Sequence, residues 1–170
     1  SIEDCVDLPP CTTQMRDVEF SSEQTKAYEA MKRDLTITLK DGRPITAVNE
    51  AVLRMKLLQI SAGAVYGPDR EINKVDSAPR INALKEILEQ TESKVVVFAP
   101  LTSVINMLNR ELKDWSREII NGEVSLKRRG EILTAFQKEK DPHNLICDTA
   151  TMAHWINEQV AAQVAGWFLT

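Results

Sequence analysis

The sequence predicts an α/β fold, in which helices flank a parallel sheet and an N-terminal helical extension precedes it. In the second half of the chain, apolar runs of strand length alternate with amphipathic segments of helix length, which is typical of βαβ units. One run, "KVVVFAP" (94–100), is nearly continuous in β-branched residues, as in a strand buried on both faces. We therefore divide the chain into residues 1–76, an N-terminal strand and helical extension, and residues 77–170, the parallel-sheet lobe.

The first half of the chain is expected to hold two helices. Pro9 and Pro10 prevent a helix in the lead-in. Ser21 or Ser22 can cap the first helix, with Glu and Gln just inside it, and Gly63 can end the second. In order, we expect an extended lead-in (1–13), a strand (13–20), a helix (21–35), a β-like segment with an Asp-Gly turn (36–46), a helix (47–63) and a turn-rich surface connection (65–79).

The second half is expected to supply the parallel sheet. The elements are a helix (78–93), a strand (94–100), a helix (101–115), a strand (117–121), a helix (125–141), a strand (144–148) and a final strand within 161–168. Ser77 and Ser125 are the expected helix caps. Ligands of such sheets bind beyond the carboxyl ends of the strands, so three loops become candidates: Ala99–Ser103, Asn121–Ser125 and Asp148–Asn157.

The composition and net charge of the chain argue against several classes of protein. The net charge of −4 argues against a dedicated nucleic-acid binder but leaves a local basic patch open. No apolar run approaches the length of a membrane span, and the acidic N-terminus lacks the apolar region of a secretory signal. The odd cysteine count indicates a reduced intracellular protein; a Cys5–Cys11 disulfide, or a metal site that uses His143 and His154, is the alternative.

No complete catalytic motif is present in the 170 residues. The sequence has no GxxxxGK[ST] or GxGxxG, no HExxH or GxSxG, and no Cys–His pair with an orienting partner. The basic cluster Lys127, Arg128 and Arg129 lies near the start of a predicted helix, where it is either a solvated face or a set of phosphate contacts. The motifs alone therefore indicate either one half of a catalytic site or a binding domain.

Six segments, read in order, carry a family resemblance. They are "LPPCTTQMRDVEFSSEQTKAYEAM" (8–31), "LRMKLLQISAGAVY" (53–66), "SAPRINALKEIL" (77–88), "KVVVFAPLTSVINMLNREL" (94–112), "INGEVSLKRRGEILTAFQ" (120–137) and "LICDTATMAHWIN" (145–157). Together they resemble the second RecA-like lobe of Swi/Snf-type ATPases of helicase superfamily two, particularly the compact phage and prophage versions. Each segment alone is unspecific; the ordered set, which covers nearly the whole chain, carries the resemblance.

The resemblance implies a RecA-like sheet and half of a motor. In this family two RecA-like lobes close on ATP and Mg²⁺, and the cycle moves the motor along duplex DNA. The first lobe holds the phosphate loop and the magnesium-binding acidic residues. The second lobe supplies motif IV and motif V contacts to DNA and nucleotide, and an arginine finger from motif VI.

The resemblance also assigns roles to individual residues. Thr102 in motif IV and Thr149 in motif V are the implied DNA-backbone contacts, since short hydroxyls donate to phosphates without reading base sequence. Lys127 and Arg128 are further DNA-contact candidates at positions that are not family signatures. Asn157 and Trp155 are implied to lie near the nucleotide, and Gly122 and Arg129 match structural positions of the motif.

Three departures from the family pattern alter what we expect. The sequence stops at Thr170, where the family continues into motif VI, and it contains no first lobe. Trp155 stands where the family has a glycine, and Asp148 adds a negative charge beside Thr149. We therefore expect a truncated lobe, inactive alone and without bound cofactor or metal, from a cytoplasmic phage or bacterial DNA-dependent ATPase that uses ATP and Mg²⁺.

The expected partners are duplex DNA, bound weakly, and the missing first lobe, with self-association also open and no membrane. The alternative is a non-catalytic interaction module that kept the lobe fold and lost the motor.

Overall fold

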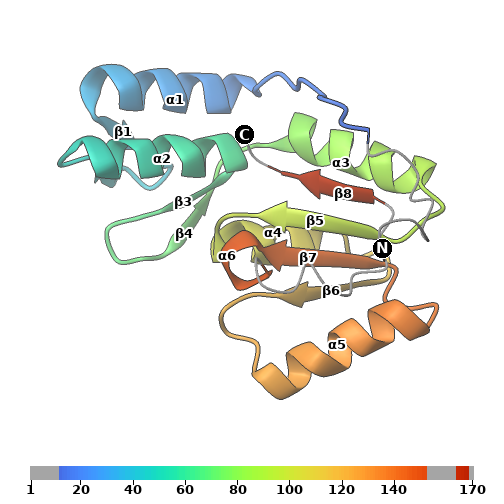
Figure 1. The fold of residues 1–170 in the computed structure, drawn as a ribbon. Helices are drawn as coiled ribbons and strands as arrows, with labels where there is room; N and C mark the ends of the chain where they lie inside the picture. Colours follow the sequence, from blue (N-terminus) through green and yellow to red (C-terminus); the bar gives the residue numbers. More distant parts are fainter. Residues whose placement is uncertain (1–11, 153–163, 169–170) are drawn as a thin grey trace, which may run out of the picture.

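A four-stranded parallel sheet forms the centre of the second half of the chain (Figure 1). The computed structural model describes residues 12–152 and 164–168. The strands are β5 (Val95–Ala99), β6 (Arg117–Ile120), β7 (Asn144–Asp148) and β8 (Val164–Trp167), in the spatial order β6-β7-β5-β8. All pairs are parallel, so the α/β prediction is confirmed.

Helices cover both faces of this sheet. They are α3 (Ala78–Gln90), α4 (Thr102–Glu111), α5 (Leu126–Lys138) and the short α6 (Thr149–Met152). Alternate residues of β5 point to opposite faces: Val95 and Val97 pack in one cluster with α3 and α4, whereas Val96 and Phe98 pack in the other with α5 and α6. Every residue of β5 is buried, as its continuous apolar run predicted.

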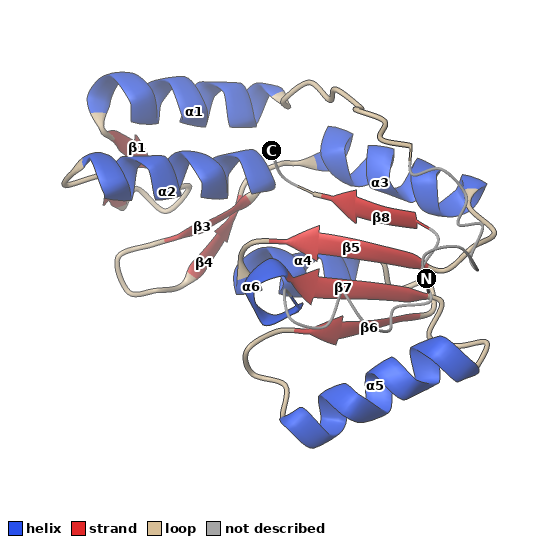
Figure 2. Cartoon of the chain, in the orientation of Figure 1, coloured by secondary structure: helices blue, strands red, loops and turns tan. Residues whose placement is uncertain are grey.

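The first half of the chain packs as two helices and two hairpins (Figure 2). These elements are α1 (Ser22–Asp34), β1 (Thr36–Thr38), β2 (Pro44–Thr46), α2 (Glu50–Ala62), β3 (Ala64–Tyr66) and β4 (Ile72–Lys74). They enclose a separate hydrophobic cluster that includes Met31, Ile45, Ile60 and Val65. Ala62 and Ala64 belong to the cluster of the lobe, so the extension is packed against the sheet half through the end of α2 and β3.

Most expected elements of the first half form. Ser21 makes a complete capping box with Gln24, and α2 ends at Gly63 in the left-handed conformation, with φ 89°. The Asp-Gly turn joins β1 to β2, with Gly42 at φ 85°.

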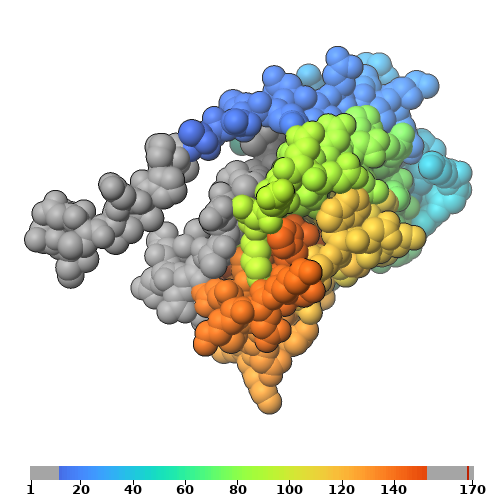
Figure 3. All heavy atoms as spheres, turned by 90° about the vertical axis from the view of Figure 1, so that its right-hand side faces the viewer, coloured from blue at the N-terminus to red at the C-terminus, as the bar shows by residue number. Residues whose placement is uncertain are grey.

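Two expectations for the first half are wrong. Residues 13–20 form no strand: Met15 is 84% exposed, and no pairing partner lies alongside among the described residues. Instead this segment runs over α3, where Arg16 lies 3.6 Å from Glu86 (Figure 3). Residues 64–74 form a hairpin, β3–β4, in the stretch that was expected to be a turn-rich surface connection (65–79).

Candidate nucleic-acid interface

Three loops leave the sheet at one edge, where the arrowheads of the strands lie together (Figure 2). In the register of the sheet, Ala99 of β5 pairs with Asp148 of β7, and Ile120 of β6 pairs with Cys147. The chain after each of these strands therefore emerges at the carboxyl edge, where parallel sheets bind ligands. This is the arrangement expected from the sequence.

The loop after β5 ends in a helix without a side-chain cap. Leu101 is the N-cap of α4 and has no polar side chain, and its carbonyl accepts from the amides of Val104 and Ile105. Among the described residues, the amides of Thr102 and Ser103 make no hydrogen bond. Free amides and the helix dipole make this terminus attractive to an anion.

Two hydroxyl groups accompany these free amides. The side chain of Thr102 is half-buried, and its hydroxyl makes no hydrogen bond within the described part of the chain. Ser103 is fully buried, with a hydroxyl that also lacks a partner there. Because buried polar atoms are normally paired, the start of α4 has unused hydrogen-bonding capacity.

The loop after β7 is organised by Asp148. Its carboxylate accepts from the amide of Ala150 at 3.1 Å and from the hydroxyl of Thr151 at 3.0 Å, which caps α6. The negative charge that the sequence places beside Thr149 is thus partly satisfied by local donors. Thr149 is half-buried, and its hydroxyl makes no hydrogen bond to the residues described. Trp155 and Asn157 lie outside the described residues.

The loop after β6 turns through Asn121 rather than Gly122. The buried Asn121 side chain accepts from the amide of Glu123 at 2.9 Å, and its carbonyl accepts from Val124 at 3.2 Å. Gly122 is not in the left-handed region, and a Cβ there would meet nothing within 4 Å. The sequence analysis assigned Gly122 a structural role in this turn. For Asn121, the only indication in the sequence was its position before that glycine.

The three cations at the start of α5 have different surroundings. Lys127 is exposed and has no ion pair among the described residues. Arg128 bonds to Glu118 at 2.8 Å and lies 3.5 Å from Glu131. Arg129 is half-buried and donates to the carbonyl of Val124, while its Nε is buried without a partner in the described part. Of these three cations, Lys127 alone therefore offers an uncommitted exposed charge within the described part of the chain.

The described residues do not fit a complete site for ATP and Mg²⁺. Asp148, the carboxylate at the end of β7, is engaged in capping α6, and Glu123 in the loop after β6 is exposed. In residues 12–152 and 164–168, no group of three or more His, Cys, Asp and Glu is placed to hold a metal. Burial and the neighbouring Asp148 raise the pKa of the Cys147 thiol to about 12, so this cysteine is not a ready thiolate.

Within the described ranges, no helix combines the length and the apolar character needed to cross a membrane.

Comparison with known proteins shows which proteins this chain resembles in sequence and in fold. No protein-family profile matches the chain. A protein named p41 from Acyrthosiphon pisum secondary endosymbiont phage 1 is 26% identical over 144 residues, which cover 84% of this chain and 25% of that protein. The structure is similar to the Sulfolobus solfataricus SWI2/SNF2 ATPase C-terminal domain, with a TM-score of 0.55, 17% identity, and coverage of 76% of this chain and 59% of the other.

These similarities confirm the fold that the resemblance implied. The chain has the fold of the Sulfolobus SWI2/SNF2 ATPase C-terminal domain, with a parallel sheet between helices. It spans a quarter of the phage protein and about three-fifths of the Sulfolobus chain.

Proposed function

We propose that this chain is the second lobe of an ATP-driven motor that moves along duplex DNA, and that its carboxyl edge binds the DNA backbone. The observation that carries the proposal is the start of α4, where the described residues provide no side-chain cap and leave two amides free beside the hydroxyl of Thr102. The helicase-like fold supports the same assignment.

The donors at this edge suit a phosphate better than a base. Amides and short hydroxyls donate to phosphate oxygens, and such contacts fix position without reading sequence. A motor that advances along DNA needs this kind of contact, because it meets a different sequence at every step. Thr149, at the end of the neighbouring strand β7, would contact a second position on the backbone.

The nucleotide would bind to the complete motor rather than to this chain alone. A partner lobe would supply the phosphate loop and the magnesium ligands, since the 170 residues contain no GxxxxGK[ST]. Asn157 and Trp155 would lie on the nucleotide side of this lobe. The chain alone is expected to show no ATP turnover, and turnover that co-purifies with the chain through successive columns would contradict that expectation.

Duplex binding by threonine variants tests the proposal. Thr102→Ala and Thr149→Ala should each weaken binding at low salt, because each lost hydrogen bond to a phosphate costs about 1 kcal/mol, roughly fivefold in affinity. Thr25→Ala and Thr134→Ala are matched controls, since both threonines are exposed on helices away from the edge. Fluorescence anisotropy of a labelled duplex gives the dissociation constants.

Two results would count against the proposal. If the control variants lose as much affinity as the edge variants, the carboxyl edge is not the contact surface. If the wild-type chain shows no binding to duplex at low salt, the alternative of a non-catalytic interaction module is favoured.

A further inference from the structure

We infer that Arg80, to which the sequence analysis assigned no role, binds a phosphate group at the same carboxyl edge. The inference rests on the proposed function and adds a phosphate contact from α3. This contact would lie near β8, the strand that flanks β5 on the side opposite β7. Three features of Arg80 support it: the position of the guanidinium, its lack of a counter-charge in the described part of the chain, and its unused donors there.

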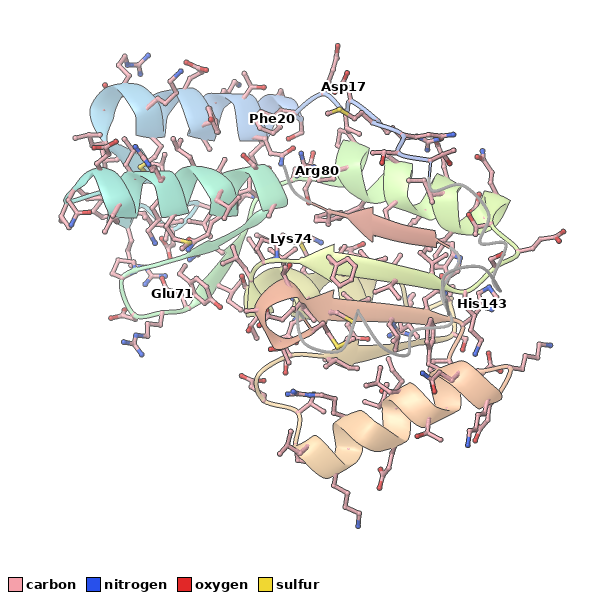
Figure 4. The ribbon with its side chains drawn as sticks, viewed as in Figure 1. Asp17, Phe20, Glu71, Lys74, Arg80 and His143 are labelled. Atoms are coloured by element: carbon pink, nitrogen blue, oxygen red, sulfur yellow. The ribbon has the colours of Figure 1, made fainter. Side chains whose placement is uncertain are left out.

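The position of Arg80 is fixed by the end of β8. Its Nη1 donates to the carbonyl of Phe168 at 2.9 Å, and the guanidinium carbon lies 5.7 Å from the centre of the Phe168 ring. The amide of Phe168 in turn donates to the carbonyl of Phe98 in β5 at 2.9 Å. Arg80 therefore lies at the carboxyl end of β8, next to the strand that leads into α4 (Figure 4).

Arg80 has no carboxylate partner among the described residues. Some other arginines are paired, since Arg54 bonds to Glu50 and Arg128 bonds to Glu118. Arg117 and Arg129 resemble Arg80 in donating only to backbone carbonyls in the described part of the chain, but only Arg80 does so at the end of β8. Arg80 is half-buried, and desolvation lowers its pKa with no acidic neighbour to offset the effect within the ranges described. A half-buried charge without a counter-charge is unfavourable, and this makes an external anion a good partner.

The guanidinium also has donors to spare. One of its five N–H groups is used on Phe168, and within the described residues Nε and Nη2 make no hydrogen bond. A guanidinium fork matches two oxygens of one phosphate, and such charge-assisted bonds are stronger than neutral ones. The contact with Phe168 would hold the side chain at the edge while its free face meets the phosphate.

A purely structural role makes a different prediction. If Arg80 only ties down the end of β8, its replacement lowers the stability of the fold but leaves the salt dependence of DNA binding unchanged. If Arg80 neutralises a phosphate, each lost contact reduces the slope of log K against log salt concentration by about 0.9 for duplex DNA. The salt slope therefore separates the two roles.

The first experiment measures this slope for Arg80→Gln, Arg80→Lys and the control Arg54→Gln. The glutamine variant at position 80 should lose close to one unit of slope, while the lysine variant and the control keep it. Arg54 is exposed and paired with Glu50, which makes it a matched arginine away from the edge. An unchanged slope in Arg80→Gln, with wild-type binding intact, would exclude a DNA phosphate as the ligand of Arg80 and leave the proposed function standing.

The second experiment observes ligand binding by the wild-type chain and uses a variant only to assign one signal. The Nε–H NMR signal of Arg80, assigned by its loss in Arg80→Lys, is followed during titration with a short duplex and, separately, with ATP. A saturable shift with duplex identifies a DNA phosphate, and a shift with ATP alone identifies a nucleotide phosphate.

The NMR titration also decides the case in which the proposed function fails. If duplex does not bind but ATP shifts the Arg80 signal, the phosphate site stands without the motor assignment. If neither ligand shifts the signal beyond a sodium chloride control, Arg80 is a structural tie and the inference is wrong.

Discussion

At the scale of single residues, Gly63 shows how a local requirement and a tertiary one meet. It ends α2 at φ 89°, a region that side chains rarely adopt. An added Cβ would also lie 2.2 Å from the hydroxyl oxygen of Ser77, which is itself buried at the start of α3. The glycine thus permits both the turn after α2 and the close approach of the segment that enters the lobe.

Replacing this glycine should be costly. Gly63→Ala is expected to lower the free energy of unfolding by at least about 1–2 kcal/mol, from the left-handed backbone alone. Gly130→Ala is the matched control: Gly130 lies inside α5, where an added methyl group would meet nothing within 4 Å, so alanine should stabilise by about 0.5–1 kcal/mol. Urea denaturation measures both, and a Gly63→Ala protein as stable as wild type would contradict the geometry.

Cys147 gives a prediction about pH. The unfolded thiol ionises near its ordinary pKa of 9.0, whereas the buried thiol stays protonated up to about 12. Between these values the unfolded state releases a proton that the native state keeps, so stability should fall as the pH rises above 9.0. Unfolding curves below and above that pH measure the fall. Cys147→Ala should show a smaller one; an equal fall in both proteins would show that other groups cause it.

The sequence revealed residues whose role is local and missed those whose role depends on the fold. The caps at Ser21 and Ser125 were readable because the cap and the amide that it accepts from are three residues apart. Arg80 was missed because its partner, Phe168, is 88 residues away. The free amides at Thr102 were visible only once the start of α4 was fixed at Leu101.

At the scale of elements, the buried side chain of Gln24 connects the two helices of the extension, α1 and α2. The Gln24 side chain accepts from the amide of Ser21 at the start of α1 and donates to the carbonyls of Ile60 and Ser61 at the end of α2. Two helix ends, each with unpaired backbone groups, are thereby satisfied by one amide. Gln24 is 1% exposed, so water cannot replace it.

Removal of this amide should therefore destabilise the extension. Gln24→Ala leaves buried donors and acceptors unpaired, at a cost of about 1–3 kcal/mol. Gln90→Ala, at the exposed last residue of α3, should change the melting temperature little. If differential scanning calorimetry gave the two variants equal melting temperatures, Gln24 would not stabilise the contact between α1 and α2.

Element prediction succeeded where periodicity was long and failed where it was short. The helices and the buried strands of the lobe have strong patterns, and all of them form. The hairpin β3–β4 has strands of three residues each, as β1–β2 has, but it lacks the Asp-Gly turn that indicated the first hairpin. The strand expected over 13–20 rested on imperfect alternation, and tertiary contact with α3 decided its path instead.

At the scale of the whole molecule, one edge of the sheet gathers the features that bear on function. The ends of β5, β7 and β8 bring together the start of α4, Thr149 and Arg80, which are far apart in sequence. The parallel topology produces this convergence, because all strands end on the same side. Because the net charge is −4, the proposed binding is expected to be weak and to depend on these few local donors.

The central claim is that the carboxyl edge is the surface that meets DNA. The most direct test is the amide NMR spectrum of the isotope-labelled chain during titration with a short duplex at low salt. Signals from residues 100–103 and 148–152 should shift together and saturate, while those of the opposite edge, at Ser116 and Asn144, stay in place. Shifts confined to that opposite edge or to α2, or no shifts at all, would contradict the account.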